Sequence, residues 1–494
     1  MKFARTLFAE LNKNSVSYCH FKSNQHLEEG LLGITDLDIL VSSTDKKGFE
    51  RTLKQHGGHK VHTPTWASYR DVDDWIVYNS HTDRTLHIHT HYTLVLGKKF
   101  VKETNLNIDT HILHNSILDK TGVYIATPAD ELIMLIVRIC IKTTVLNIFA
   151  GIFNSKKLLP DNMHDELEYL YTQTTAEEIK AASIQLLEKI PTEKIVARIE
   201  SVRNSRTVFL MIHLKFFWLL HGYTYRTKNI FSVYGAYFIK SFRSKISSKL
   251  NKTGFNLRIT KKTVSHSQPG LIIAIVGADG AGKSTLNTTI YNWLSWKIAV
   301  SNIYLGRHWL FLKLEALKKS IMGTSSKKTS TGKKQESKHP LKILTSDIRK
   351  LLNVSRRHTQ LKKAVGLKEK GFIVLTDRFP QNQICGLNDG PSIAITDKSP
   401  FWRKFIHVYE KRMYDAMAQT QPDILIKLMV TENIALARKP DHNKEQIQKK
   451  IEIIKELNFN AKKIYEIDTT QRNANEVARQ VKSLIWKRIQ EYEN

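Results

Sequence analysis

The sequence predicts an α/β protein of more than one domain, whose carboxyl-terminal part is an open parallel sheet flanked by helices. From residue 268 to 494, apolar runs typical of buried strands alternate with helical patterns, which is the order that a parallel sheet requires. Residues 1–125 mix strand-like runs with loops, as an α+β domain does, and residues 126–262 carry apolar residues at helical spacing. A chain of 494 residues is long enough for three such regions.

The composition is that of a globular protein in a reducing compartment. Hydrophobic residues make up 41% of the chain, and the three cysteines are isolated from one another, which argues against a disulfide framework or a cysteine-based metal site. The first residues lack the apolar core of a secretory signal, and no uncharged apolar run is long enough to cross a bilayer. We therefore expect a cytoplasmic protein.

The chain is strongly basic, with 76 Lys and Arg against 46 Asp and Glu and a net charge of +30. Such a field favours acidic partners, namely nucleic acid, an anionic membrane face or phosphorylated small molecules, although solvated lysine-rich faces produce it as well. In residues 230–250, aromatic side chains alternate with Lys and Arg. That pattern suits a helix lying on anionic lipid at the inner membrane face, or a helix that packs one face on a neighbour while its lysines reach solvent.

The amino-terminal region contains two carboxylates, Asp36 and Asp38, on the strand-like run at 36–43. Side chains two residues apart share one face of a strand, so these two can hold a divalent ion between them. A second strand-like run, at 84–96, includes the sequence LHIHTHYTL. This run would place several histidines on one face.

The strand-like run LIIAIV is followed directly by GADGAGKST, at residues 277–285, and then by a helical pattern. The run matches G-x-x-x-x-G-K-[ST] in the strand–loop–helix setting that this pattern needs. Glycines let successive backbone amides curl around a phosphate, and the following helix adds its positive end. Lys283 would reach the outer phosphates, and the hydroxyl of Ser284 would ligate Mg²⁺. The loop therefore predicts binding of ATP with Mg²⁺.

Two later segments bear on where the phosphate goes. The buried-strand pattern GFIVLT ends in Asp377 and Arg378, at the carboxyl end where open sheets bind their ligands. The carboxylate can hold Mg²⁺ through water or orient an acceptor oxygen, and the arginine can grip an acceptor phosphate. Further on, Arg438 lies on a helical segment that could close over a transferring phosphoryl group.

The motifs GADGAGKST, DRFP, RKPD and IDTT fall in the order and rough spacing of the thymidylate kinase-like branch of P-loop nucleoside monophosphate kinases, which this region, residues 268–494, resembles. The resemblance implies a parallel sheet flanked by helices, ATP as donor, Mg²⁺ and a lid that carries an arginine. A thymine-reading pocket is not recognisable, so the resemblance does not identify thymidylate as the acceptor. The run DGP at 389–391 is similar to thymidylate kinase-like proteins found with bacterial surface-polysaccharide genes. The site residues that follow are Gly277, Asp279, Gly280, Gly282, Lys283, Ser284 and Thr285 for the cofactor, Lys283, Asp377, Arg378 and Arg438 for catalysis, and Ser284 and Asp377 for the metal.

Residues 10–120 resemble a nucleotidyltransferase-fold domain. The run GITDLD, which ends in Asp36 and Asp38, looks like the metal-binding strand of that fold, and Lys22 falls where relatives carry a basic residue. The third carboxylate that the resemblance implies is not found, because histidines stand in its place at 87, 89 and 91. Either the domain binds without catalysis or its metal differs. The histidines themselves could bind a transition metal, contact a phosphate or sugar, or serve only the structure.

The first functional hypothesis is an ATP-dependent kinase that acts on a nucleotide, sugar or glycan-related acceptor, in bacterial surface-glycan or nucleotide metabolism. Two alternatives stay open: a protein that processes nucleic-acid ends or binds RNA, and a nucleotide-gated scaffold at the membrane surface. The expected partners are ATP and a small-molecule or glycan acceptor, with an anionic membrane, nucleic acid and a second copy of the chain as further hypotheses.

Overall fold

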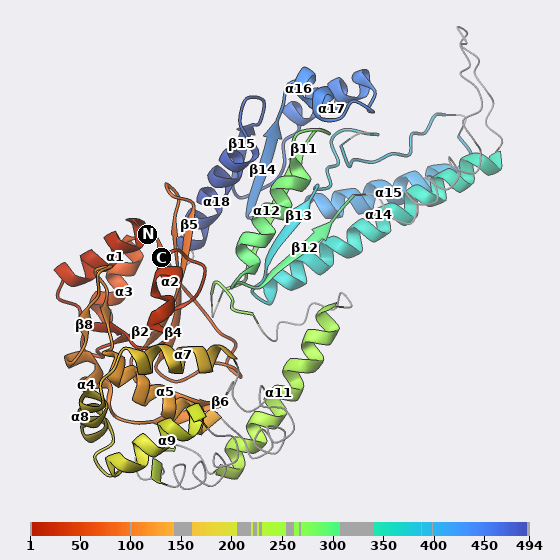
Figure 1. Ribbon diagram of the computed structural model, residues 1–494. Helices are drawn as coiled ribbons and strands as arrows, with labels where there is room; N and C mark the ends of the chain where they lie inside the picture. Colours follow the sequence, from red (N-terminus) through yellow and green to blue (C-terminus); the bar gives the residue numbers. More distant parts are fainter. Residues whose placement is uncertain are drawn as a thin grey trace. The chain divides into compact units, whose positions relative to one another are not determined.

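The computed structural model describes residues 2–98, 101–142, 161–204, 219–220, 225–226, 230–252, 261–265, 268–306, 340–386, 388–397 and 399–491 (Figure 1). The chain divides into two compact units, the first made of Met1–Val264 with Ile489–Asn494, and the second of Ser265–Arg488. The separate helical region at 126–262 stays a prediction. Among the described helices, none combines the length and apolarity needed to span a bilayer.

The first unit is built on a seven-stranded mixed sheet with the order β3-β4-β5-β2-β1-β9-β8. In this sheet β2 pairs in parallel with β5 and antiparallel with β1, and β4 pairs antiparallel with β5. A second sheet has the order β10-β7-β6. The strands are β1 (Tyr18–His20), β2 (Leu37–Val41), β3 (Gly58–Val61), β4 (Val72–Asn79), β5 (Arg84–His91), β6 (Val95–Lys98), β7 (Val101–Asn105), β8 (Ile117–Leu118), β9 (Tyr124–Ile125) and β10 (Tyr225–Arg226).

The run at 84–96, which reads as a single strand in the sequence, is divided between two sheets. β5 ends at His91 and β6 begins at Val95. Between them the amide of Val95 donates to the carbonyl of Thr93, and the amide of Leu94 donates to the Asp109 carboxylate. This turn breaks a pattern whose period alone would continue the strand.

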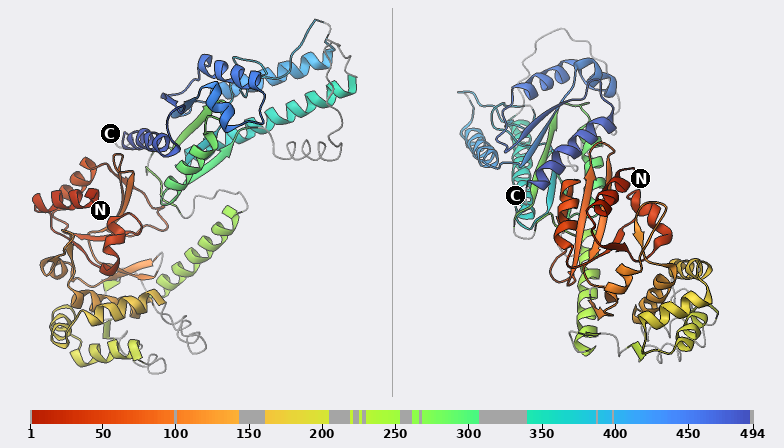
Figure 2. Two further views of the ribbon diagram at one scale, coloured as in Figure 1. Left: turned by 45° about the horizontal axis from the view of Figure 1, so that its top comes forward. Right: turned by 90° about the vertical axis from the view of Figure 1, so that its left-hand side faces the viewer.

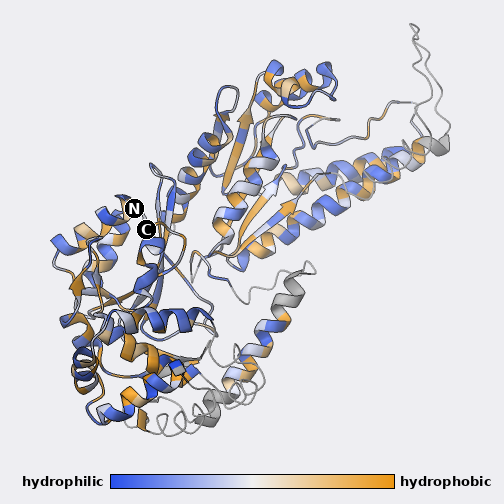
Figure 3. Ribbon diagram, in the orientation of Figure 1, coloured by the Kyte–Doolittle hydropathy of each residue, from blue (hydrophilic) through white to orange (hydrophobic). Residues whose placement is uncertain are grey.

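Helices cover both faces of the larger sheet. Successive side chains of β2 point to opposite faces of the sheet and enter two different apolar cores. Ile39 packs with residues of α1, and Leu40 packs with residues of α5. Figure 3 shows the hydrophobic colouring of α5, which is buried along most of its length. The helices are α1 (Lys2–Lys13), η1 (Asn24–His26), α2 (Leu27–Leu31), α3 (Lys46–Gln55), α4 (Asp109–His114), α5 (Pro128–Lys142), α7 (Asp161–Thr172), α8 (Ala176–Leu186), α9 (Thr192–Asn204) and α11 (Ile230–Lys252).

The second unit is built on a five-stranded, fully parallel sheet with the order β12-β13-β11-β14-β15. The central strand β11 is buried at six successive positions, as expected for a strand covered on both faces. This confirms the predicted α/β class with a parallel sheet flanked by helices. The strands are β11 (Leu271–Gly277), β12 (Val300–Tyr304), β13 (Ile373–Asp377), β14 (Ile424–Met429) and β15 (Ile464–Asp468).

The helices of the second unit lie on both sides of its sheet. α14 and α15, which run side by side in Figure 2, share an apolar core with Ile272, Ala274 and Val276 of β11. α12 contributes no residue to that core, and its Trp293 contacts Trp486 of α18. The helices are α12 (Lys283–Ser295), α14 (Pro340–Glu369), α15 (Phe401–Ala418), α16 (Glu432–Arg438), α17 (Lys444–Glu456) and α18 (Ala474–Gln490).

Candidate active site

The glycine loop connects β11 to α12, as the sequence predicts. Gly280 and Gly282 have φ of +83° and +91°, a conformation that residues with a Cβ rarely adopt. A Cβ on Gly280 would lie 2.7 Å from the carbonyl oxygen of Ala435, whereas nothing lies within 4 Å of the Cβ position of Gly282. The loop is therefore closely packed on α16 at one glycine and open at the other.

Lys283 stands at the first position of α12 and folds back over the loop. Its ammonium group donates to the carbonyl oxygens of Gly277 and Ala278, at 2.9 and 2.8 Å. Burial of the ammonium lowers its pKa below the ordinary value, and the nearby guanidinium of Arg378 lowers it further. The following residues, Ser284 and Thr285, are exposed. Among the described residues, the hydrogen-bond partners of the amine are these two carbonyls, in a place where an anion would favour its charged form.

Asp377 ends β13 directly beside the glycine loop, because β13 and β11 pair in parallel with Ile275 opposite Asp377. Its Oδ1 is buried and has no hydrogen-bond partner among the described residues. Desolvation raises the pKa of this carboxyl, although the positive charges of Lys283 and Arg378 oppose the shift. A buried carboxylate oxygen without a partner suits a cation or a bound water.

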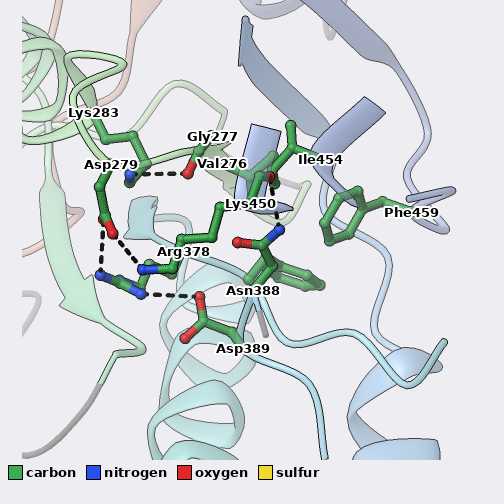
Figure 4. Close-up of a pocket in the computed structure, with 11 residues that line it drawn as sticks. Val276, Gly277, Asp279, Lys283, Arg378, Asn388, Asp389, Lys450, Ile454 and Phe459 are labelled. Carbon is green, nitrogen blue, oxygen red and sulfur yellow. Dashed lines mark hydrogen bonds and ion pairs between the residues drawn. The ribbon is translucent and has the colours of Figure 1, made fainter. Parts of the chain in front are cut away.

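Arg378, the next residue, lies between two carboxylates. Its guanidinium is 3.5 Å from an oxygen of Asp389 and 3.9 Å from an oxygen of Asp279 (Figure 4). Burial alone would lower the pKa of Arg378, but Asp389, Tyr304 and Asp279 raise it by more, so the group stays charged. Its φ of 72° is unusual for a residue with a side chain, and the amide donates to the carbonyl of Ile275.

These residues line a pocket beside the loop (Figure 4). Lys450, on α17, forms an ion pair with Asp279 and helps to hold the pKa of that carboxyl below its usual value, against the effect of burial. Asn388 donates to the carbonyl of Lys450. The pocket lining consists of Val276, Gly277, Asp279, Lys283, Arg378, Phe379, Asn388, Asp389, Lys450, Ile454 and Phe459.

A second arginine contacts a carboxylate of the pocket lining. Arg357, in the middle of α14, donates to a carboxylate oxygen of Asp389 at 2.9 Å and to the carbonyl of Leu305 at 2.7 Å. It also contacts the hydroxyl of Tyr414, whose pKa burial raises to about 12. Arg357 and Lys450 could not be recognised as site residues from the sequence, because a basic residue within a lysine-rich helix has nothing to distinguish it from its neighbours.

Arg438 lies at the end of α16, on the other side of the loop. Its guanidinium donates to the carbonyl of Gly280 at 3.2 Å and to the carbonyl of Thr469 at 2.8 Å. Thr469 in turn donates to carbonyls of the loop and of β14. Arg438 therefore ties the glycine loop to the turn after β15. The action of Arg438 on a transferring phosphate stays a prediction.

In the first unit, Asp36 and Asp38 have different neighbours. Asp36 lies 2.9 Å from Nδ1 of His87, and Asp38 lies 2.8 Å from the ammonium of Lys22. A site shared by the two carboxylates stays a prediction. A further acidic side chain beside His87 and His89 is Asp74 of β4, which the sequence-based prediction does not include. The run DVDDW, at residues 71–75, is the sequence signal for Asp74, because it places acidic residues on β4, the strand that pairs with β5.

The strand order and the glycine loop together define the structural class of the second unit. A parallel sheet whose first strand is central, followed by a loop of the form G-x-x-x-x-G-K-S that opens a helix, is the architecture of the P-loop nucleotide-binding proteins. No family model matches the chain. It is 34% identical over 213 residues to the uncharacterized ATP-binding protein YghS of Escherichia coli K12, a match that covers 42% of this chain and 89% of that protein. The chain belongs to the family of that protein.

A second relative and two solved structures complete the comparison. The uncharacterized ATP-binding protein YghR of the same organism is 34% identical over 211 residues, covering 41% of this chain and 81% of that protein. Thymidylate kinase from Candida albicans is 16% identical, covers 46% of this chain and 95% of its own, and has a TM-score of 0.29. Deoxyadenosine kinase from M. mycoides is 14% identical, covers 44% and 98%, and has a TM-score of 0.26. At such TM-scores, the likeness adds no argument to that from the sheet order and the loop.

Proposed function

We propose that this protein is an ATP-dependent phosphotransferase that moves the γ-phosphate of ATP to an acceptor held in the pocket beside the glycine loop. One observation carries the proposal: Arg378, at the carboxyl end of β13, lies between Asp279 of the loop and Asp389, in the same pocket that Lys283 reaches. A loop that only bound ATP would not need an arginine and two carboxylates gathered next to the phosphate position. These groups supply the charge pattern that an acceptor needs.

The residues at the loop fit ATP with Mg²⁺. The open side of the loop at Gly282 leaves room for phosphates, and Lys283 would exchange its two carbonyl partners for phosphate oxygens. Ser284 and Asp377 would hold Mg²⁺, whose charge would neutralise the transferring group. The chain's own contribution to the rate would then be positioning and electrostatic stabilisation by Lys283 and Arg378.

The pocket favours an acceptor that carries both an anionic group and hydroxyls. Arg378 and Lys450 offer positive charge to a phosphate, while Asp279 and Asp389 can accept hydrogen bonds from hydroxyl groups. A nucleotide, a phosphorylated sugar or a glycan-related acceptor has this chemistry. A role in surface-glycan or nucleotide metabolism, a cytoplasmic location and a homodimeric state stay predictions.

The test is transfer of label from [γ-³²P]ATP to nucleoside monophosphates, sugars, lipid-linked glycans and RNA ends, each with purified full-length protein. We expect labelling of a phosphorylated small molecule or glycan and a loss of turnover by orders of magnitude in Lys283→Ala. Lys449→Ala, an exposed lysine of the same unit, is the control and should keep its activity. Near-normal transfer by Lys283→Ala, or label in RNA ends alone, would contradict the proposal.

A second candidate is attachment to an anionic membrane surface through α11. Within its described side chains, Phe238, Ile239 and Phe242 are 73%, 67% and 60% exposed. The helix has five Lys and Arg and no acidic residue between Ile230 and Lys252. Apolar exposure together with positive charge is typical of helices that lie in a lipid headgroup region. Flotation of the full chain with phosphatidylserine vesicles, lost in Phe238→Ser with Phe242→Ser, tests this candidate; equal flotation of the variant would contradict it.

A further inference from the structure

We propose that Asp38, His89 and His91 of the first unit bind one divalent transition-metal ion of the zinc type. Each of these residues offers one ligand atom, and the three atoms lie within 4.8 Å of one another. The site is separate from the glycine loop and is independent of the proposed phosphotransfer. Its ligands differ from the carboxylate pair Asp36 and Asp38 that the sequence indicates.

The backbone brings these ligands together on one face of the sheet. β2 and β5 pair in parallel, with Asp38 opposite His89, and His91 lies two residues further along β5. Residues two apart share a strand face, so all three side chains project toward the side where α5 packs. The rings of His89 and His91 have centroids 4.8 Å apart. Two ligands come from one strand and one from its neighbour, both in the interior of a seven-stranded sheet, which is a rigid support.

A carboxylate behind the site sets the protonation of His89. Asp74 on β4 is the register partner of His89, and its Oδ1 lies 2.8 Å from Nδ1 of that ring. Asp74 is buried, and a carboxylate oxygen at that distance from a ring nitrogen accepts a hydrogen bond from it. Nδ1 of His89 must then carry the proton, which leaves the lone pair on Nε2. A histidine oriented by a carboxylate in this way is the usual arrangement around protein-bound metal ions.

The donor set selects the class of metal. Two imidazole nitrogens and one carboxylate oxygen suit Zn²⁺, Co²⁺ or Ni²⁺, whereas Mg²⁺ and Ca²⁺ prefer oxygen ligands alone. Zinc–ligand bonds of about 2.0–2.1 Å require neighbouring ligand atoms roughly 3.4 Å apart. The separations between ligand atoms would therefore shorten by at most about 1.4 Å on binding, a change that rotation of the histidine rings can supply. Three protein ligands leave a coordination position open, as in catalytic zinc sites.

Lys22 is the competitor at this site. Its ammonium lies 2.8 Å from Oδ1 of Asp38, the same oxygen that is 4.0 Å from Nε2 of His91. The ammonium of Lys22 already stands beside the carboxylate of Asp38, so a metal ion must either displace this ammonium or bind the same carboxylate together with it. Replacing Lys22 by a neutral side chain of similar length should therefore strengthen metal binding, which a purely structural histidine cluster would not do.

The experiment uses tag-free, full-length protein freed of metal with a chelator. Equilibrium dialysis should show one Zn²⁺ bound per chain, and Co²⁺ should give the intense visible absorption of a four- or five-coordinate site. We expect His91→Ala and His89→Ala to weaken Co²⁺ binding at least tenfold, and Lys22→Met to tighten it. His114→Ala removes an exposed histidine from the same unit and should have no effect.

Further variants keep the test valid if an alanine variant misfolds. Asp38→Asn keeps the shape of the ligand and should abolish the cobalt band in a chain with wild-type circular dichroism, and Asp74→Asn should weaken binding about tenfold through His89. Absence of stoichiometric Zn²⁺, or a cobalt band that persists in both Asp38→Asn and His91→Ala, would overturn the assignment. Because the readout is binding, failure here leaves the phosphotransfer proposal untouched.

Discussion

Lys450 on α17 forms an ion pair with Asp279 in the glycine loop, a residue 171 positions earlier in the chain. The contact is partly buried and lies at the edge of the pocket where Arg378 also approaches Asp279. It joins the loop that would hold the donor to a helix that closes one side of the acceptor pocket.

Lys450→Ala should impair acceptor binding more than ATP binding. Without the ammonium, Asp279 loses its nearest partner, and a charge-assisted contact of this kind contributes on the order of 1.5–3 kcal/mol. We expect the acceptor KM to rise about tenfold or more while the Kd of ATP stays unchanged. Steady-state kinetics with the acceptor found in the screen, together with ATP titration calorimetry, measures both. The neighbouring Lys449→Ala should behave as wild type, and equal effects of the two substitutions would contradict a role for the Asp279 contact.

Gly280→Ala should weaken ATP binding at least about tenfold. The new Cβ would need a left-handed backbone, which costs roughly 1–2 kcal/mol, and would lie 2.7 Å from the carbonyl oxygen of Ala435. The matched control is Gly366→Ala in the middle of α14, where nothing lies within 4 Å and the backbone is helical. That substitution should stabilise the protein by about 0.5–1 kcal/mol. Titration calorimetry measures the Kd of ATP in both variants, and thermal unfolding measures their stability. The prediction is wrong if Gly280→Ala and Gly366→Ala bind ATP equally well.

Arg438→Ala should lower kcat by about a hundredfold or more if this arginine acts on the transferring phosphate. In the structure its guanidinium instead donates to Gly280 and Thr469, so a purely supporting role would appear as weaker ATP binding with little change in kcat. Comparing kcat and the Kd of ATP in Arg438→Ala and in the adjacent, exposed Lys439→Ala separates the two roles. A change confined to Kd would refute the catalytic assignment.

Glu131 should make the first unit less stable as the pH rises. Burial, and then repulsion from Glu166, raise the pKa of this carboxyl from 4.5 to about 7. A raised pKa in the folded state means that stability is full below about 4.5 and is lost as the pH rises to about 7, by an amount on the order of 3 kcal/mol. Hydrogen exchange of α5 peptides, corrected for the intrinsic effect of pH, measures this. In Glu131→Gln this dependence of stability on pH should disappear. An unchanged dependence would mean that other groups cause it.

Much of the nucleotide site could be predicted because its residues are contiguous. Gly277 to Ser284 form one loop whose function depends on local backbone geometry, and Asp377 and Arg378 follow a strand that must be buried. Parallel pairing then brings the end of β13 beside the loop, since carboxyl ends of parallel strands meet at one edge. A pattern of glycines and apolar runs contains all of this information.

The residues that complete the pocket come from distant parts of the chain. Arg357 and Lys450 lie on two separate helices, α14 and α17, and each resembles an ordinary solvated charge when only its neighbours in sequence are considered. The same holds for Asp74, which meets His87 and His89 only because β4 and β5 pair in one particular register. A shift of one residue would turn the carboxylate to the other face.

The amino-acid sequence by itself determined the parallel α/β class, the phosphate-binding loop and the strand ends beside it, because periodicity and glycine geometry are local properties. Only the tertiary structure decided which charges face each other across the pocket, and which histidines gather with Asp38. Those pairings depend on strand register and helix packing, which are set by the burial of apolar surface over the whole unit and not by the charged residues themselves.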